Sequence, residues 1–125
     1  MKLKRSDLSS LSVPQLVDLF ARIGLEEDEA HKVDDRAKRR RLPYEMDAVQ
    51  AELKSRAGDQ RRALLPLYDH PNMQVRLMAA KYTLAVAPAD ARRMIEWIAA
   101  SNWFPYAGDA GMCLYMLDKG AFVPK

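Results

Sequence analysis

The amino-acid sequence predicts an all-α protein, on three observations. Apolar residues recur every three or four positions along most of the chain, as on one face of a helix, and no segment alternates with the period of a strand. Residues that cap or end helices stand at the breaks in this pattern: Ser12, Gly58, Asn72 and Gly120. The connections are short, so consecutive helices should lie antiparallel. We therefore expect antiparallel helical hairpins, about five to six helices in total, in a single domain over residues 1–125.

Length and composition restrict the class of protein. The chain has 125 residues, 49% of them hydrophobic and 30% charged, which is typical of one globular domain and not of a disordered chain. No apolar run approaches the roughly 18 residues that span a membrane, and the N-terminus lacks the apolar core of a signal peptide. The single cysteine, Cys113, excludes an internal disulfide and fits a reducing compartment. We expect a cytoplasmic protein that does not enter the membrane.

The first two helices follow from two apolar stripes. Residues 1–11 precede the first stripe and are expected to form a flexible tail. Ser12 should cap the first helix, with Pro14 in its first turn. Its apolar positions are Val13, Leu16, Val17, Phe20 and Ile23, continued beyond Gly24 by Ala30 and Val33. The second stripe comprises Leu42, Met46, Val49 and Leu53. Pro43 should lie in its first turn or kink it, which leaves its start open.

Four further helices follow, each bounded by a turn. Asp59 should cap the third, whose apolar positions are Ala63, Leu64, Leu67 and Tyr68. Asn72 should cap the fourth, which should bury Val75, Met78, Ala79, Tyr82 and Val86. Pro88 follows the fourth helix, and Asp90 should lie in the first turn of a fifth, which has Ile95, Trp97 and Ile98 among its apolar positions. Residues 101–109, SNWFPYAGD, should form a loop, and a last short helix, about Ala110 to Leu117, should end at Gly120.

The segment LLPLYDHPNMQVRLMAAKYTLA, residues 64–85, poses the main question about function. An aspartate, a histidine and an arginine gather around Asp69-His70, and the turn could be either a site or the hinge of a helical hairpin. Its two prolines, the pair Val75-Arg76 and the small pair Ala79-Ala80 resemble a HEAT repeat, in which two antiparallel helices meet at a tight turn. His70 stands where an acidic residue is common in that repeat. We interpret the segment as a hinge.

The resemblance extends along most of the chain. RRALLPLYDHPNMQVRLMAAKYTLAVAPADARRMIEWIA and the later DAGMCLYMLDKG are similar to a small bacterial family known as domain of unknown function 2019. The similarity runs from about Leu11 to Gly120 and is most specific between Arg62 and Pro88. That family is grouped with armadillo/HEAT-like folds, so the resemblance implies a short HEAT-like α-solenoid of stacked hairpins. It implies no catalytic residues.

No arrangement of reactive side chains predicts an enzyme. His31 and His70 lie far apart in the sequence, and the pair Asp28-x-x-His31 would need a second helix with an acidic residue and a histidine to hold two metal ions. Cys113 lies in the apolar segment GMCLYML and is expected to be a small buried residue. No nucleophile is placed beside His70, and the five glycines form no phosphate loop. We expect no catalytic residue, no metal and no cofactor.

A protein-interaction module is the function that the sequence favours. Stacked helix pairs bury one face and offer the other to a partner. Trp and Tyr dominate interface energies, so the candidate anchors are the aromatic residues Trp97, Trp103, Phe104 and Tyr106. The same aromatics could instead close the end of the core. Small HEAT-like bacterial proteins include immunity proteins that block a toxin, which makes a neutralising partner of another bacterial protein a specific form of this hypothesis.

Nucleic-acid binding is the alternative. From Lys32 to Arg41 the chain carries six basic residues, and Arg39, Arg40 and Arg41 are the candidates that would neutralise phosphates. The preceding acidic block Glu26-Glu27-Asp28-Glu29 would repel a phosphate backbone, and the formal net charge is only +3. Charge runs of this kind also commonly form solvated helix faces. We therefore favour a protein partner over a nucleic acid.

Overall fold

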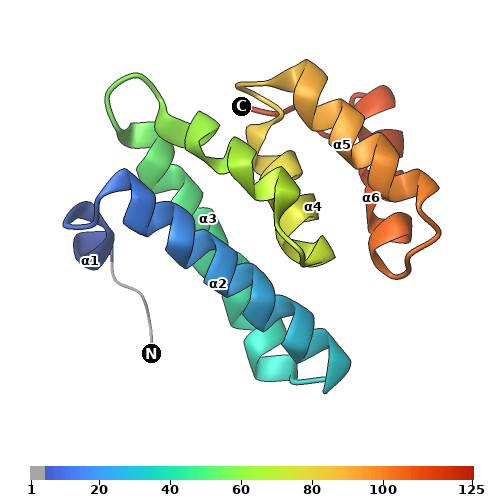
Figure 1. Ribbon diagram of the computed structural model, residues 1–125, viewed down its shortest axis with the longest axis horizontal. Helices are drawn as coiled ribbons and strands as arrows, with labels where there is room; N and C mark the ends of the chain where they lie inside the picture. Colours follow the sequence, from blue (N-terminus) through green and yellow to red (C-terminus); the bar gives the residue numbers. More distant parts are fainter. Residues whose placement is uncertain (1–4) are drawn as a thin grey trace. The chain divides into compact units, whose positions relative to one another are not determined.

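The computed structural model describes residues 5–125, and every regular element in this range is a helix (Figure 1). The seven helices are α1 (Arg5–Ser9), α2 (Val13–Lys32), α3 (Arg36–Ser55), η1 (Gln60–Asp69), α4 (Met73–Thr83), α5 (Pro88–Ala100) and α6 (Tyr106–Asp118). The all-α prediction is confirmed. The number of helices exceeds the expected range because α1 forms a short helix before the first predicted one.

The chain divides into two compact units. The N-terminal unit ends at Ala63, and the C-terminal unit spans Leu64–Lys125. The expectation of a single domain stays a prediction. Among the described residues, no helix combines the length and the apolar character needed to cross a membrane.

The N-terminal unit is built on a hairpin of α2 and α3, which lie side by side (Figure 1). The predicted cap Ser12 starts α2 with a reciprocal pair of hydrogen bonds. The Gln15 N–H donates to Ser12 Oγ over 3.2 Å, and the Ser12 N–H donates to Gln15 Oε1 over 2.8 Å. Helix α2 continues through Gly24, which is buried. Packing in the hairpin outweighs the roughly 1 kcal/mol lower helix propensity of glycine.

Helix α3 begins at Arg36, well before the predicted stripe, because Asp35 caps it. The Lys38 N–H donates to Asp35 Oδ1 over 3.1 Å. Pro43 therefore lies inside the helix and not in its first turn. The basic run of the sequence forms the first turns of this helix. The stripe itself is confirmed, since all four of its members are buried: Leu42, Met46, Val49 and Leu53.

Residues 5–11 differ from the flexible tail that the sequence predicts for residues 1–11. Arg5–Ser9 forms α1, and Leu8 is buried. The Arg56 guanidinium donates to the carbonyl oxygens of Leu8 (3.2 Å) and Leu11 (2.7 Å), so the segment is held by hydrogen bonds as well as by apolar burial. Residues 1–4 of the expected tail lie outside the described residues.

The third predicted helix is a 3₁₀ helix, η1. Pro66 lies inside it and lacks the N–H that an α-helical turn would use. Asp59 precedes it with a positive φ of 47°, and its carboxylate accepts a hydrogen bond from the Arg61 backbone N–H over 3.3 Å. The same carboxylate pairs with the Arg61 guanidinium over 2.8 Å. This side-chain hydrogen bond from Arg61 is the main reason that the pKa of Asp59 lies below its usual value.

The C-terminal unit packs α4, α5 and α6 around one core, with α5 in contact with both of its neighbours (Figure 1). Asn72 caps α4 as predicted, because the Val75 N–H donates to Asn72 Oδ1 over 3.1 Å. The buried residues of this core are Met73, Leu77, Ala80, Leu84, Ala91, Ile95, Ile98, Tyr106, Ala110 and Cys113. The core thus draws on all three α-helices.

The predicted buried face of α4 is right only in part. Val75 and Ala79 are fully buried, and Leu77, which the sequence pattern did not single out, is fully buried too. The remaining predicted positions are half-buried: Met78, Tyr82 and Val86. Helix α4 buries residues on more than one side, so its buried positions do not follow the single apolar stripe that was expected from the sequence.

The last helix is longer than predicted. It runs over Tyr106–Asp118, so the expected loop over residues 101–109 ends four residues early. The Ala107 N–H donates to the Trp103 carbonyl oxygen over 2.8 Å and closes the first turn. Gly108 and Gly111 lower the helix propensity of this stretch, but burial of Tyr106 and Ala110 in the core outweighs that effect.

Replacing Asn72 with alanine should lower the free energy of unfolding by about 0.5–2 kcal/mol, because the cap of α4 is lost. Chemical denaturation of the parent and the variant measures the change. Asn72→Asp keeps an oxygen acceptor at the cap and serves as the matched control, with stability close to that of the parent. An Asn72→Ala protein as stable as the parent would show that this hydrogen bond contributes nothing.

Replacing Asp59 with asparagine should make the free energy of unfolding depend less on pH in the acidic range. The pKa of Asp59 is depressed in the folded protein, so its charge stabilises the fold above the unfolded pKa of about 3.9, and this contribution is lost as the pH falls through the folded value. Asparagine tolerates the positive φ but carries no charge. At neutral pH we expect a loss of about 0.2–1 kcal/mol, the range for exposed ion pairs. Denaturation across a pH series tests this, and a difference that does not change with pH would contradict it.

Candidate functional site

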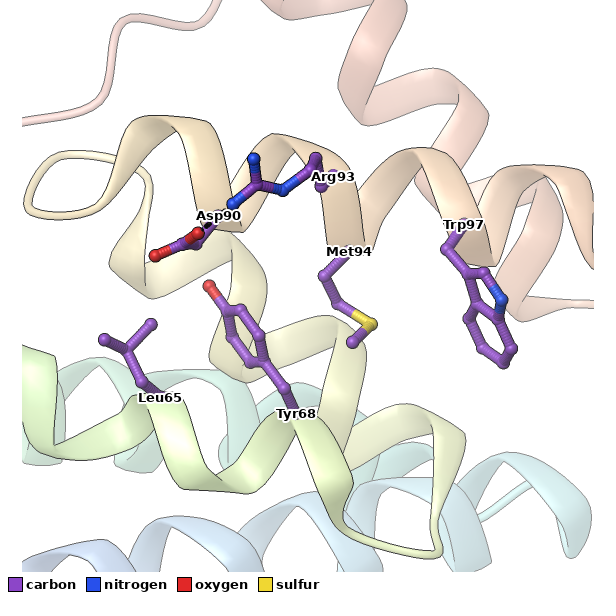
Figure 2. Close-up of a pocket in the computed structure, with 6 residues that line it drawn as sticks. All are labelled: Leu65, Tyr68, Asp90, Arg93, Met94 and Trp97. Atoms are coloured by element: carbon purple, nitrogen blue, oxygen red, sulfur yellow. Dashed lines mark hydrogen bonds and ion pairs between the residues drawn. The ribbon is translucent and has the colours of Figure 1, made fainter.

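An open groove in the C-terminal unit gathers three half-buried apolar side chains and the exposed Trp97. It has a volume of about 400 Å³ and lies between η1 and α5 (Figure 2). Its lining residues are Leu65, Tyr68, Asp90, Arg93, Met94 and Trp97. In Figure 2 the ion pair of Asp90 and Arg93 lies at one end and Trp97 lies at the other, with Met94 and Tyr68 between them. The groove therefore combines an apolar floor with one charged end and one aromatic end.

One face of α5 supplies four of the lining residues. Asp90, Arg93, Met94 and Trp97 are spaced three, one and three positions apart, which places them on one side of the helix. An adjacent side of the helix buries Ala91, Ile95 and Ile98. Trp97 is therefore not a core residue, and 53% of its surface is exposed. Trp97 was predicted from the sequence as a candidate contact residue and the other lining residues were not, although the helical spacing of the α5 positions is visible in the sequence.

The indole of Trp97 contacts an arginine in the first turn of α4. The guanidinium carbon of Arg76 lies 5.7 Å from the centroid of the Trp97 ring, within the range of a cation–π contact. Arg76 Nε donates to the carbonyl oxygen of His70, and the Asn72 N–H donates to His70 Nδ1 over 3.0 Å. The histidine and arginine of the hinge thus stabilise the turn and orient Trp97.

Tyr68 forms a fixed wall of the groove. Its hydroxyl lies 2.5 Å from Thr83 Oγ1, and the Thr83 hydroxyl also donates to the Ala79 carbonyl oxygen over 2.8 Å. Burial raises the pKa of Tyr68, and the nearby carboxylate of Asp90 raises it further, against the opposing effect of the Thr83 hydrogen bond. The phenol therefore stays neutral at physiological pH and offers its ring face to a ligand.

The aromatic segment at the start of α6 divides into exposed and buried members. Trp103 and Phe104 are 55% and 67% exposed. Tyr106 is only 8% exposed, and it meets the Trp103 ring edge-on with centroids 6.3 Å apart. The expectation of Tyr106 as a partner contact is corrected, because this ring belongs to the core of the C-terminal unit. Trp103 and Phe104 stay candidates.

The basic residues form a second candidate site, in the N-terminal unit. Arg39 pairs with Asp34 over 2.7 Å, and Arg41 pairs with Glu45 over 2.7 Å, so these two charges are compensated locally. Arg36 and Arg40 form no ion pair in the described part of the chain. With Arg39 and His31 they line an open hollow of about 440 Å³.

Side chains suited to chemistry do not converge in the described range. Residues 5–125 contain no group of three or more His, Cys, Asp or Glu side chains that could hold a metal ion. Cys113 is buried as expected, and burial raises the pKa of its thiol, which keeps the thiol protonated and weakly nucleophilic.

Comparison with known proteins gives a family and a close structural relative. The crystal structure of the protein RPA1889 from Rhodopseudomonas palustris CGA009 is similar, with a TM-score of 0.93 and 52% sequence identity over 99% of this chain and 100% of that one. No curated protein matches the sequence. The family model for domain of unknown function DUF2019 matches residues 14–118. The chain therefore belongs to the DUF2019 family.

Proposed function

We propose that the protein is a non-catalytic protein-interaction module and that the groove beside Trp97 binds its partner. The observation that carries this proposal is a half-exposed tryptophan, in cation–π contact with Arg76, at the edge of an apolar groove. Large aromatic side chains set in preformed surfaces are the residues that dominate interface energy.

The chemistry of the groove describes the partner. Leu65, Met94 and the ring of Tyr68 would receive apolar side chains, and the methionine thioether adapts to different shapes. The ion pair of Asp90 and Arg93 at one end would orient a polar group of the partner. A protein segment with apolar anchors and a polar end fits this pattern.

We further propose a HEAT-like arrangement of the helix pairs. Three features support this arrangement: the hinge at His70–Asn72, the proline inside η1, and the contacts of α5 with both α4 and α6. By analogy with small HEAT-like immunity proteins, the module would neutralise another bacterial protein in the cytoplasm by tight binding. The analogy rests on architecture.

Trp97→Ala should weaken partner binding by about tenfold or more, as expected for an aromatic anchor. The test is affinity capture from the native cytoplasm with the parent protein, followed by titration of the captured partner. Tyr44→Ala removes another exposed aromatic ring, in α3, and serves as the matched control, with unchanged affinity. Both variants should keep the parent's thermal midpoint. A partner that binds Trp97→Ala and the parent equally would overturn the proposed site.

Nucleic-acid binding stays the second candidate function. The observation that favours it is a hollow lined by His31, Arg36, Arg39 and Arg40. Among the described residues, no carboxylate pairs with Arg36 or Arg40, so their charges remain available to a phosphate. The local pairing of Arg39 and Arg41 reduces the charge available to phosphates. We therefore rank this function below protein binding.

Fluorescence anisotropy with labelled duplex and single strands separates the two functions. If phosphates bind the hollow, affinity should fall steeply with salt because counterions are released. Arg36→Glu with Arg40→Glu should then abolish binding to every sequence tested, while Arg62→Glu, an exposed arginine after the N-terminal hairpin, should have a smaller effect. We expect no salt-sensitive binding by the parent protein.

A further inference from the structure

Helix α6 has apolar residues on more than one side, although the core of the C-terminal unit covers only one of them. Ala107, Ala110 and Cys113 are buried toward the core of the C-terminal unit. On the other side, Met112 and Tyr115 are 60% and 55% exposed. Helices that are apolar all round are normally covered all round. The exposed side of α6 therefore lacks a cover within the described chain.

The exposed residues form one continuous face. At 100° per residue, Gly108, Met112, Tyr115 and Met116 fall on the same side of α6, and all four are exposed. We call these four residues the α6 outer face. Phe104 extends it beyond the start of the helix, since a Cβ on Gly108 would lie 3.8 Å from Phe104 Cδ1. Gly108 itself has no side chain, and the Phe104 ring lies beside its Cα.

Two opposite charges bound the α6 outer face. Asp109 stands near the start of α6 and Lys119 directly after its end, about 15 Å apart at the rise of an α-helix. Neither forms an ion pair in the part of the chain that the structure describes. Asp118 cannot supply a partner for Lys119, because it pairs with Arg92 over 3.0 Å. The Lys119 ammonium lies over the Tyr115 ring, 5.0 Å from its centroid, and so borders the apolar face.

We propose that the α6 outer face binds a second copy of this chain, with the two α6 helices antiparallel about a two-fold axis near Leu114. In this arrangement Asp109 of each copy faces Lys119 of the other, and Met112 faces Met116. A parallel arrangement would instead place like charges opposite one another at both ends. The face is thus complementary to itself, which is what a two-fold interface requires. This interface is separate from the groove beside Trp97 and does not depend on its function.

Sedimentation velocity over a wide range of concentration tests the dimer. The parent protein should shift from a monomer of 14.2 kDa to twice that mass as concentration rises. Met112→Glu should raise the dissociation constant by about tenfold or more, because it places a charge at the centre of the interface. The side chain is exposed in the monomer, so the variant should fold normally. A parent protein that stays monomeric at every concentration would overturn the proposal.

A charge exchange tests the antiparallel register. Asp109→Lys alone and Lys119→Asp alone should each weaken the dimer, because each places like charges opposite one another. The double variant Asp109→Lys with Lys119→Asp should restore it, since the opposite pairs re-form in reversed order. Trp97→Ala should leave the dimer unchanged. Failure of the double variant to restore the dimer, with the fold intact by circular dichroism, would overturn this arrangement.

Discussion

The hydrogen bonds of the turn from His70 to Arg76 are the constraint on which the C-terminal unit depends. The His70 ring accepts the Asn72 N–H, and Asn72 then caps α4, so the turn determines where that helix begins. The Arg76 side chain closes the turn by donating to the His70 carbonyl oxygen and ends over the indole of Trp97. One set of contacts therefore fixes both a core helix and the aromatic residue of the candidate site.

The C-terminal unit exposes apolar side chains that its core does not need. Leu77, Ile95 and Ile98 are fully buried without help from Trp97 or Met112, which lie on other sides of their helices. Exposed apolar clusters of this kind commonly mark sites of interaction. Polar side chains would interact more favourably with solvent at the same positions than apolar ones do. The groove and the α6 outer face are thus two separate candidate surfaces on different helices.

Local chemistry made several features predictable from the sequence. Ser12 and Asn72 cap helices because their side-chain oxygens accept hydrogen bonds from N–H groups only three residues away. The stripe from Leu42 to Leu53 is buried because its spacing matches the helical period. The residue type of Trp97 makes it a candidate anchor. The spacing of Asp90, Arg93 and Met94 places them on the same face of α5 as Trp97. None of these features depends on distant parts of the chain.

The sequence by itself determined the all-α class and the main helix caps, because these depend on neighbouring residues and on periodicity. The tertiary structure alone decided which aromatic ring of the segment from Trp103 to Tyr106 is buried, since that depends on the packing of α6 against the core. It also decided that α6 extends through two glycines and that Arg76 lies over Trp97. Burial and contacts between segments distant in the chain cannot be inferred from local propensity, because the neighbours that create them come together only in the folded protein.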